Sequence, residues 1–362
     1  MKRKCFLRRV NTLPGKDVCR PKGFPVGSTW QSVGAPLYSG RHAPDPHSRF
    51  VRGNSHLRDS RSTAGTHAHP PTLGVAMTMT PDSLHPRPRR TVGRLLGIAP
   101  ENDLQLTERR ESSRSIGIEI TLVFLITLGM SGLTSLVSLI ETSIKAAQAK
   151  TVISHYVIAV AAPKSTVNYV DLVYQLLSIT KGLAEGALGL YLLWRAGFAL
   201  SRRLGLNLQR PGWDTGLGFG LAALIGIPGL GLYLLSQHLG FSLTVQASTM
   251  TDVWWRVPVT ILIAVENGFL EEVLVVGYLT TRLQQLRWPT VAVILGSAVL
   301  RGTYHLYQGY GAFVGNAIMG IIFAWFYLRF RRLWPLVIAH TLIDTVTLVA
   351  YPLLKGHVSW LP

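Results

Sequence analysis

Cysteine is nearly absent from this sequence. The 362-residue chain has two cysteines, Cys5 and Cys19, and both stand near its N-terminus. The chain after Cys19 therefore offers no thiolate nucleophile and no cysteine that could form a disulfide. Cysteine-protease chemistry and cysteine-ligated zinc sites are excluded for that part of the chain.

Charge is also scarce. Only 15% of the residues are charged and 48% are hydrophobic, and the mean hydropathy is +0.28. Lys and Arg number 36 against 18 Asp and Glu. A chain of this length and apolarity is untypical of soluble proteins, so the composition indicates a membrane protein with a basic bias.

Long apolar runs are missing from residues 1–114. This stretch holds 20 Lys/Arg against 8 Asp/Glu and is rich in Pro, His, Ser and Gly. It cannot bury enough apolar surface to offset its chain entropy, so we predict a disordered basic tail. Such a tail can bind nucleic acid or anionic lipid, but a solvated tail with no nucleic-acid partner is favoured. Met77 and Met79 suggest the further hypothesis that residues 1–76 are a mis-assigned extension.

Residues 115–362 carry the apolar runs, and we predict an all-α, polytopic transmembrane helix bundle there. A helix needs about 20 mostly apolar residues to cross a bilayer. Seven segments meet this description: Ser115–Ile140, Val167–Trp194, Trp213–Ser236, Trp254–Thr281, Trp288–Leu306, Gly311–Leu328 and Trp334–Leu354. A further stretch, Ile144–Ala162, is apolar enough to be an eighth or a re-entrant segment.

The loop charges predict an orientation in the cell membrane. With the N-terminus inside, the inner loops carry nine arginines and the outer segments carry four lysines, which favours a cytoplasmic N-terminus. The arginines are Arg195, Arg202, Arg203, Arg210, Arg282, Arg287, Arg329, Arg331 and Arg332, and the lysines are Lys145, Lys150, Lys164 and Lys355.

Glycine crowds the third predicted span, which reads GLGFGLAALIGIPGLGLYLL from Gly216. No strand precedes these glycines, so a phosphate-binding loop is disfavoured. Close helix packing explains them better, with a kink at Pro228.

Ionisable residues interrupt the last four predicted spans. An ionised side chain at the bilayer centre costs on the order of 3 kcal/mol, so each needs a partner or a use. A single buried pair is commonly no more than a satisfied contact between helices, but so many together favour a functional site. They are Glu266, Asn267, Glu271, Glu272, Arg301, His305, Asn316, His340 and Asp344.

Their spacing groups them by helix face. His340 and Asp344 are four residues apart and share a face, and so do Arg301 and His305. Counted at about 1.5 Å per residue from the inner ends of straight helices, however, the glutamates and the two histidines lie at different depths. Tilt, a cavity or a fifth helix that begins later is needed to bring them together.

Adjacent glutamates suggest hydrolysis by an activated water. Glu271 and Glu272 are about 100° apart on a helical wheel, so we expect them to flank one cavity but not to contact one partner. One would act as general base, and a histidine would hold the water or donate to the oxyanion. Asp344 would orient the ring of His340. No Ser or Cys stands beside a histidine as a nucleophile would.

The order of these motifs resembles that of the CPBP family, the CAAX prenyl protease and bacteriocin-processing membrane proteins, also called Abi proteins. The resemblance covers about Val265–Val349 and rests on three motifs in order. They are Glu271-Glu272-x-x-x-x-Gly277-Tyr278, then His305, then Leu333-Trp334-Pro335 leading to Ala339-His340-x-x-x-Asp344.

The resemblance implies an intramembrane endopeptidase with its catalytic core at 254–354. It implies that Glu271 and Glu272 are the family's glutamate pair, with Glu271 the favoured base. It also implies that no metal or cofactor is needed. Substrates would be peptides or membrane proteins, and some relatives cleave prenylated C-termini. The other residues that it assigns to the site are His305, His340 and Asp344, with Arg301 and Asn316 in support.

Two positions depart from the family pattern. The family usually has Arg where this chain has Val276, and Phe where this chain has Arg301. We therefore predict that the two helices meet and that Arg301 supplies the missing positive charge to Glu272. If it does not, the chain is a non-catalytic member.

Three other functions stay open. A zinc hydrolase could use a glutamate and two histidines, although no His-Glu-x-x-His motif is present. A membrane scaffold or export accessory would need no chemistry. A proton-coupled transporter could use the buried Glu, His and Asp residues, but no inverted repeat is detectable.

Overall fold

A computed structural model describes residues 111–354 and 357. All of them belong to one compact unit of the chain, His85–Pro362. The predicted basic tail, the proposed extension 1–76, the two cysteines and Lys355 lie almost wholly or wholly outside the described residues.

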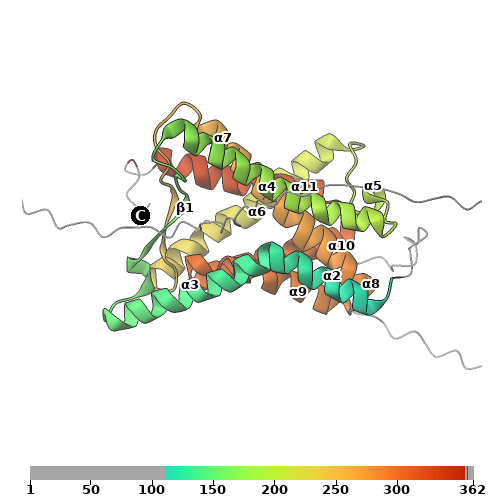
Figure 1. The fold of residues 1–362 in the computed structure, drawn as a ribbon. Helices are drawn as coiled ribbons and strands as arrows, with labels where there is room; N and C mark the ends of the chain where they lie inside the picture. Colours follow the sequence, from blue (N-terminus) through green and yellow to red (C-terminus); the bar gives the residue numbers. More distant parts are fainter. Residues whose placement is uncertain (1–110, 355–356, 358–362) are drawn as a thin grey trace, which may run out of the picture. The chain divides into compact units, whose positions relative to one another are not determined.

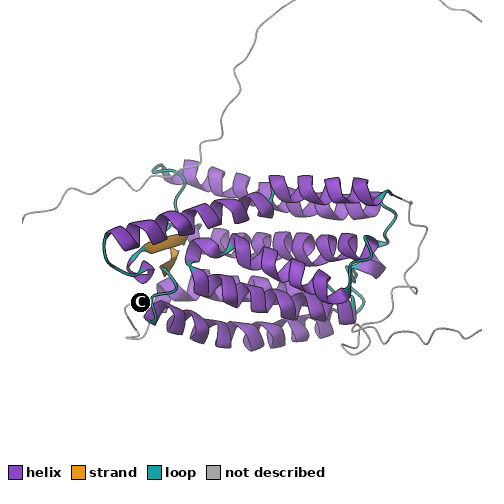
Figure 2. Cartoon of the chain, turned by 90° about the horizontal axis from the view of Figure 1, so that it is seen from below, coloured by secondary structure: helices purple, strands orange, loops and turns teal. Residues whose placement is uncertain are grey.

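The described chain folds into helices joined by short connections and one small sheet (Figures 1 and 2). The longer helices are α2 (Ser113–Ile126), α3 (Leu128–Gln148), α4 (Asn168–Arg195), α6 (Pro211–His238), α7 (Arg256–Glu271), α9 (Thr290–Tyr304), α10 (Tyr310–Phe330) and α11 (Trp334–Thr345). The shorter ones are α5 (Leu200–Arg203), α8 (Leu279–Gln285), α12 (Tyr351–Leu354) and the 3-10 turns η2 (Ile153–His155) and η4 (Leu306–Gln308). Two π-helices are η3 (Glu272–Tyr278) and η5 (Val346–Ala350).

The predicted count of seven or eight spans is not confirmed. Within the described residues, three helices, α4, α6 and α10, are long and apolar enough to cross a membrane. Helices α2 and α3 meet at a bend of 53° and give a fourth span if they count as one. Helix α9 and the run α11–η5 are shorter apolar helices. The elements α7, η3 and α8 follow one another without a loop, and Glu266, Glu271 and Glu272 lie near the middle of this run.

The all-α prediction is wrong in one respect, because a two-stranded parallel sheet is present. Strands β1 (Val157–Ala161) and β2 (Thr244–Ser248) pair with Val157 opposite Thr244. The segment predicted as an eighth span therefore ends α3, turns and then forms β1. Its Val-Ile-Ala-Val-Ala run is too short for a helix and suits a half-buried strand.

Glycines let α4 approach the helix that carries the glutamate pair. A Cβ on Gly186 would lie 2.7 Å from the Phe269 ring, and one on Gly189 would lie 2.6 Å from Leu274. Since real Cβ atoms do not come so close, only glycine permits this packing. The two glycines thereby allow α4 to pack closely against α7 and η3, beside the glutamates.

The glycines of α6 fulfil the packing prediction only in part. A Cβ on Gly218 would lie 2.5 Å from Ile338 of α11, so this glycine does permit a close contact. A Cβ on Gly216 or Gly220 would meet nothing within 4 Å. Helix α6 also continues as one helix through Pro228.

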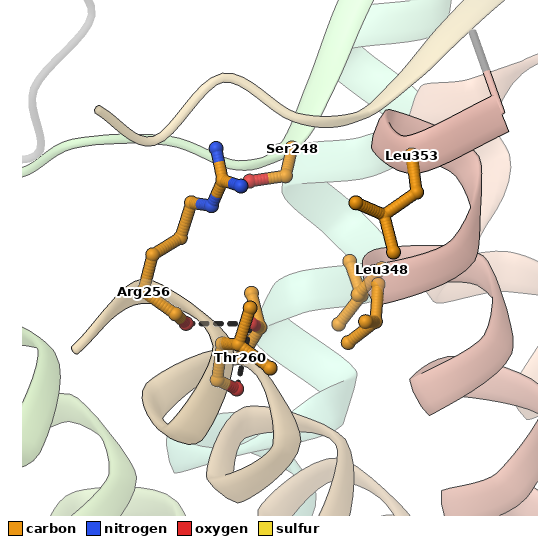
Figure 3. Close-up of a pocket in the computed structure, with 7 residues that line it drawn as sticks. Ser248, Arg256, Thr260, Leu348 and Leu353 are labelled. Carbon is orange, nitrogen blue, oxygen red and sulfur yellow. Dashed lines mark hydrogen bonds between the residues drawn. The ribbon is translucent and has the colours of Figure 1, made fainter. Parts of the chain in front are cut away.

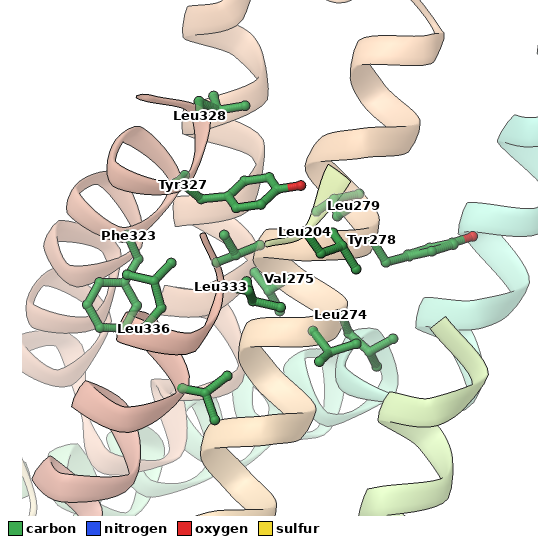
Figure 4. Packing of buried hydrophobic residues seen from close by; sticks show 14 of the residues in the cluster. Leu204, Leu274, Val275, Tyr278, Leu279, Phe323, Tyr327, Leu328, Leu333 and Leu336 are labelled. Carbon is green, nitrogen blue, oxygen red and sulfur yellow. The ribbon is translucent and has the colours of Figure 1, made fainter. Parts of the chain in front are cut away.

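The core is built around η3, and all seven of its residues are buried. Figure 4 shows Val275 of η3 on the side of Tyr327 of α10 and of Leu333, next to the start of α11, while Leu274 and Tyr278 point to the other side of the helix. Because interiors are close-packed and resist deformation, the residues next to η3 are held by a rigid frame.

Buried ion pairs fasten the helix ends that carry most arginines. Arg282 is fully buried and forms paired hydrogen bonds of 2.9 Å with the two carboxylate oxygens of Glu119, joining α8 to α2. Arg332 bonds Asp214 in the same forked way, which joins the start of α11 to α6. Forked arginine–carboxylate pairs add directional strength.

Candidate active site

Glu271 and Glu272 lie where one helix changes its winding. Glu271 is the last residue of α7 and Glu272 the first of η3. Both are buried, with 8% and 0% of their surface exposed. Single π-turns occur often at functional sites.

Arg301 of α9 contacts both carboxylates. Its Nη2 donates to Glu272 Oε1 at 2.6 Å, and its Nη1 lies 3.5 Å from Glu271 Oε2. The predicted contact between Arg301 and Glu272 is therefore present. The expectation that the two glutamates contact no common partner is wrong, because the guanidinium has two forward nitrogens and the turn from Glu272 is a wide π-turn.

Helix α10 fixes the arginine from the other side. The guanidinium lies over the ring of Phe323, 5.4 Å from its centroid. A Cβ on Gly320 would lie 2.8 Å from the Cα of Ala298, so glycine lets α10 pack closely against α9, the helix that carries the arginine. Arg301 is fully buried and has little freedom to leave the glutamates.

His340 of α11 joins the same carboxylate. Its Nδ1 lies 2.7 Å from Glu272 Oε1, and a carboxylate accepts, so Nδ1 carries the hydrogen. Its Nε2 lies 4.0 Å from Glu271 Oε2 and 3.7 Å from Asp344 Oδ1. The ring is thus oriented by Glu272 and not, as predicted, by Asp344, whose Oδ1 is too far from Nε2 for a hydrogen bond.

Asp344 has another partner. Its Oδ2 accepts from Asn267 Nδ2 of α7 at 3.2 Å. The pair joins α11 to α7 one turn away from the glutamates. Asp344 therefore lies near Nε2 of His340 without forming a hydrogen bond with it.

Tyr304 was missed by the sequence reasoning. Its hydroxyl donates to Glu271 Oε2 at 2.6 Å, and Ser135 of α3 donates to its carbonyl oxygen at 3.1 Å. Its position three residues after Arg301 is the signal that could have found it, because residues three apart share a helix face.

His305 and Asn316 were also predicted for the site, but their hydrogen bonds are with backbone oxygens of α9 and α10. His305 caps α9, and its Nδ1 donates to the carbonyl oxygen of Arg301 at 3.0 Å, which leaves the Nε2 lone pair for another ligand. Its ring lies against that of Tyr304, with centroids 4.8 Å apart. Asn316 donates to Ala312 within its own helix at 3.0 Å.

The described residues contain no group of three or more His, Cys, Asp or Glu side chains placed to hold a metal ion. A small hollow lies at another part of the molecule, between β2, α7 and η5 (Figure 3). Arg256, Ser248 and Leu348 are among its lining residues. Thr260, the nearest lining residue on α7, precedes Glu271 by eleven positions, roughly 16 Å along the helix, so the hollow is separate from the glutamate site.

Comparison with known proteins found a match to a family model. No curated protein and no solved structure matches the chain. Residues 253–346, roughly a quarter of the chain, match the family model of type II CAAX prenyl endopeptidase, Rce1-like. That segment contains both glutamates, Arg301, Tyr304, both histidines and Asp344. The resemblance predicted from the motifs is thus confirmed for residues 253–346, which are similar to the Rce1-like type II CAAX prenyl endopeptidases.

Proposed function

We propose that the chain is an intramembrane endopeptidase in which Glu271 activates the water that cleaves a peptide bond. The observation that carries this is the buried glutamate pair itself, whose two members accept hydrogen bonds from different donors. Glu272 is bound by Arg301 and His340, whereas Glu271 is bound by Tyr304 through one oxygen.

The partners divide the work between the glutamates. Oε1 of Glu272 accepts from both Arg301 and His340, and the residue is fully buried. Such a carboxylate serves to hold the side chains of Arg301 and His340 in place. Oε2 of Glu271 accepts from Tyr304, and its Oε1 is the oxygen that can take a proton. Glu271 is therefore the better base.

The reaction is then a general-base hydrolysis. Oε1 of Glu271 takes a proton from water, and the water oxygen attacks the carbonyl carbon of the substrate. Nε2 of His340 lies 4.0 Å from Glu271 Oε2. It would donate to the oxyanion when the ring carries a hydrogen on both nitrogens, since Nδ1 donates to Glu272. The C–N bond breaks, and the proton on Glu271 passes to the leaving nitrogen.

The family whose model matches names the substrate class to test first. A C-terminal Cys-aliphatic-aliphatic-X sequence carries a prenyl group on its cysteine. A prenyl group partitions into lipid, which suits a site buried among apolar helices. We propose a membrane-bound peptide of this type, cleaved near the prenylated cysteine.

The test compares the full chain with its Glu271→Gln variant in lipid vesicles. The probe is a quenched fluorescent peptide with an S-prenylated cysteine four residues from its C-terminus. We expect cleavage by the wild type and a loss of at least a hundredfold in Glu271→Gln, with thermal unfolding unchanged because the amide keeps the volume. Equal activity of the two proteins would contradict the proposal.

Two alternatives have distinct signatures in the same experiment. A zinc hydrolase would contain stoichiometric zinc after purification and would lose activity to a chelator. A scaffold or export accessory would cleave no peptide, and Glu271→Gln would leave its partner binding intact.

A further inference from the structure

We propose that Tyr307 is a further catalytic residue, whose hydroxyl donates a hydrogen bond to the substrate carbonyl oxygen as that oxygen becomes an oxyanion. This inference rests on the proposed function, because only a hydrolysis with a tetrahedral intermediate develops a negative oxygen. Tyr307 lies in η4, the turn between α9 and α10, and belongs to none of the three sequence motifs.

The winding of the chain places Tyr307 on the same side as Tyr304. At the end of α9 the backbone changes to hydrogen bonds that span three residues, since His305 N donates to the carbonyl oxygen of Gly302 at 3.1 Å, and η4 continues as a 3-10 turn. Such a turn has about three residues, so side chains three apart lie one above the other. Tyr304 donates to Glu271 Oε2, and Tyr307 therefore lies one turn beyond it on the face that meets this glutamate.

The residue before Tyr307 faces another way. Leu306 packs against a buried cluster that includes Leu139 of α3 and Leu243, just before β2. Successive residues of a 3-10 turn are about 120° apart, so the ring of Tyr307 is turned away from that cluster. The residue is half-buried, as expected for a side chain at the rim of a site.

The electrostatics give the same direction for the hydroxyl. Burial raises the pKa of Tyr307, the hydrogen bond from Gln308 lowers it, and the charges of Glu271 and Asp344 raise it, to about 12 in all. Charges act on a hydroxyl in this way only when they are near it. The hydroxyl therefore lies near both carboxylates, and it is protonated at neutral pH, as a hydrogen-bond donor must be.

Gln308 prepares this hydroxyl to donate. Its Nε2 donates to Tyr307 Oη at 2.7 Å, so one lone pair is filled and the phenolic hydrogen points elsewhere. Within the described residues, that hydrogen has no acceptor at hydrogen-bond distance. The hydrogen of Tyr304, by contrast, is held by Glu271. Tyr307 is thus the better oxyanion donor of the two tyrosines.

The turn that carries Tyr307 is held on its other side. The carbonyl oxygen of Gln308 accepts from Leu243 N at 2.9 Å, and Gly309 forms a bridge with Ser242. Gly309 has a φ of 109°, and a Cβ there would lie 2.7 Å from Ser242 Cα, so glycine permits both the turn and the close contact. A donor fixed before the reaction needs no reorganisation when charge develops.

The hydroxyl acts at one step of the hydrolysis. The water oxygen attacks the carbonyl carbon, and the electron pair of the C=O π bond moves to the carbonyl oxygen. Tyr307 donates its O–H to that oxygen and keeps its proton, and the bond relaxes when the C–N bond breaks. Nε2 of His340 donates only when both ring nitrogens carry a hydrogen, whereas Tyr307 donates in either state of that ring.

The first experiment removes only the hydroxyl. Tyr307→Phe keeps the ring and should lower kcat about a hundredfold on the prenylated peptide described above, the usual cost of losing one oxyanion donor. KM should change by less than about threefold, and thermal unfolding should stay close to wild type. Tyr310→Phe is the matched control, because it removes an exposed hydroxyl that bonds Ser143, and it should keep the wild-type kcat.

The second experiment distinguishes a catalytic hydroxyl from a structural one. A prenylated peptide with a phosphinate in place of the scissile amide carries a negative oxygen where the oxyanion forms. Tyr307→Phe should weaken inhibition by this phosphinate about as much as it lowers kcat/KM, while KM for the peptide hardly changes. Both quantities are measured on the same folded enzyme, so their comparison decides even if the variant is less stable.

A third variant tests how Gln308 positions the hydroxyl. Gln308→Met removes the hydrogen bond to Tyr307 Oη and should lower kcat about five- to tenfold. In the Tyr307→Phe background the same change should have no further effect, because the group that it positions is already absent. Losses that multiply in the double variant would contradict the positioning role.

The outcomes separate this inference from the proposed function. A wild-type kcat in Tyr307→Phe, or a lower kcat with unchanged inhibition by the phosphinate, overturns the role of Tyr307 and leaves the endopeptidase standing. Parallel losses of kcat/KM and of inhibition, with Tyr310→Phe unaffected, support it. No cleavage of the prenylated peptide by the wild type overturns both proposals for this substrate class.

Discussion

A single carboxylate oxygen, Oε1 of Glu272, holds three helices together. It accepts from Arg301 of α9 and from His340 of α11, while Glu272 itself begins η3. Two donors to one oxygen hold such a carboxylate in place. Removing one partner of a buried ion pair typically costs about 3–5 kcal/mol, since the other charge stays behind.

The displaced arginine gives the sharpest residue-scale prediction. Arg301→Phe should lower both stability and activity, because Glu272 loses a partner. Val276→Arg alone should also be harmful, because Val276 is fully buried and a second cation would enter. The double variant restores the usual family pattern and should recover much of the loss in a double-mutant cycle on unfolding and on cleavage. If the losses of stability and activity in the two single variants simply add in the double variant, an arginine at position 276 does not replace Arg301.

Tyr304 gives a second prediction. Tyr304→Phe removes the donor to Glu271 Oε2 and should lower kcat at least tenfold with a small effect on KM. The acidic limb of its pH–rate profile should also move to higher pH, because the carboxylate of Glu271 loses a hydrogen bond that favours its ionised form. Tyr310→Phe is the control, because that hydroxyl is exposed and meets only Ser143. An unshifted profile would assign Tyr304 a packing role.

At the scale of elements, the motif order was enough to select the candidate site. The glutamate pair, the two histidines and the contact between Arg301 and Glu272 all follow from residue type and spacing. Convergence in space does not follow, because depths counted along straight helices ignore tilt. The partner of His340 was also unpredictable, since Asp344 and Glu272 are equally good acceptors and only tertiary packing chooses between them.

The strands were missed for a related reason. Val-Ile-Ala-Val-Ala is as apolar as a helix segment, and a short apolar run does not distinguish strand from helix. Its pairing partner lies more than eighty residues later, at β2. Long-range pairing of this kind leaves no local signal.

Close approach of α4 to α7 gives the element-scale prediction. Gly186→Ala places a Cβ 2.7 Å from the Phe269 ring and 3.3 Å from the backbone of Leu270, so overpacking should cost about 1–3 kcal/mol. Gly220→Ala is the control, because its Cβ meets nothing within 4 Å, and it should be neutral or slightly stabilising. Thermal unfolding in detergent measures both. Equal stability of the two variants would mean that the helices separate easily.

For the whole molecule, orientation is still to be measured. We expect the N-terminus and the loop before α6 to be cytoplasmic, as the arginine excess favours. In a chain whose Cys5 and Cys19 are replaced by serine, Leu208→Cys should react with an impermeant thiol reagent only after the cells are opened. Thr251→Cys, beyond α6, should react in intact cells. The reverse pattern would contradict the orientation, and labelling of both from one side would show that α6 does not cross.

The wide turn from Glu272 to Tyr278 bears on how this protein can change length over evolution. A π-turn holds one more residue than the α-turn it replaces, so the segment can lose a residue without breaking the helix. A deletion there would convert the π-turn into an α-turn, so the residues after it, including Arg282 with its bond to Glu119, would keep their orientation relative to Glu271. Descendants that lose that residue should therefore keep the bond between Arg282 and Glu119, and a gap at η3 should need no compensating substitution on α2, whereas a deletion within α7 would turn the glutamates away from their partners.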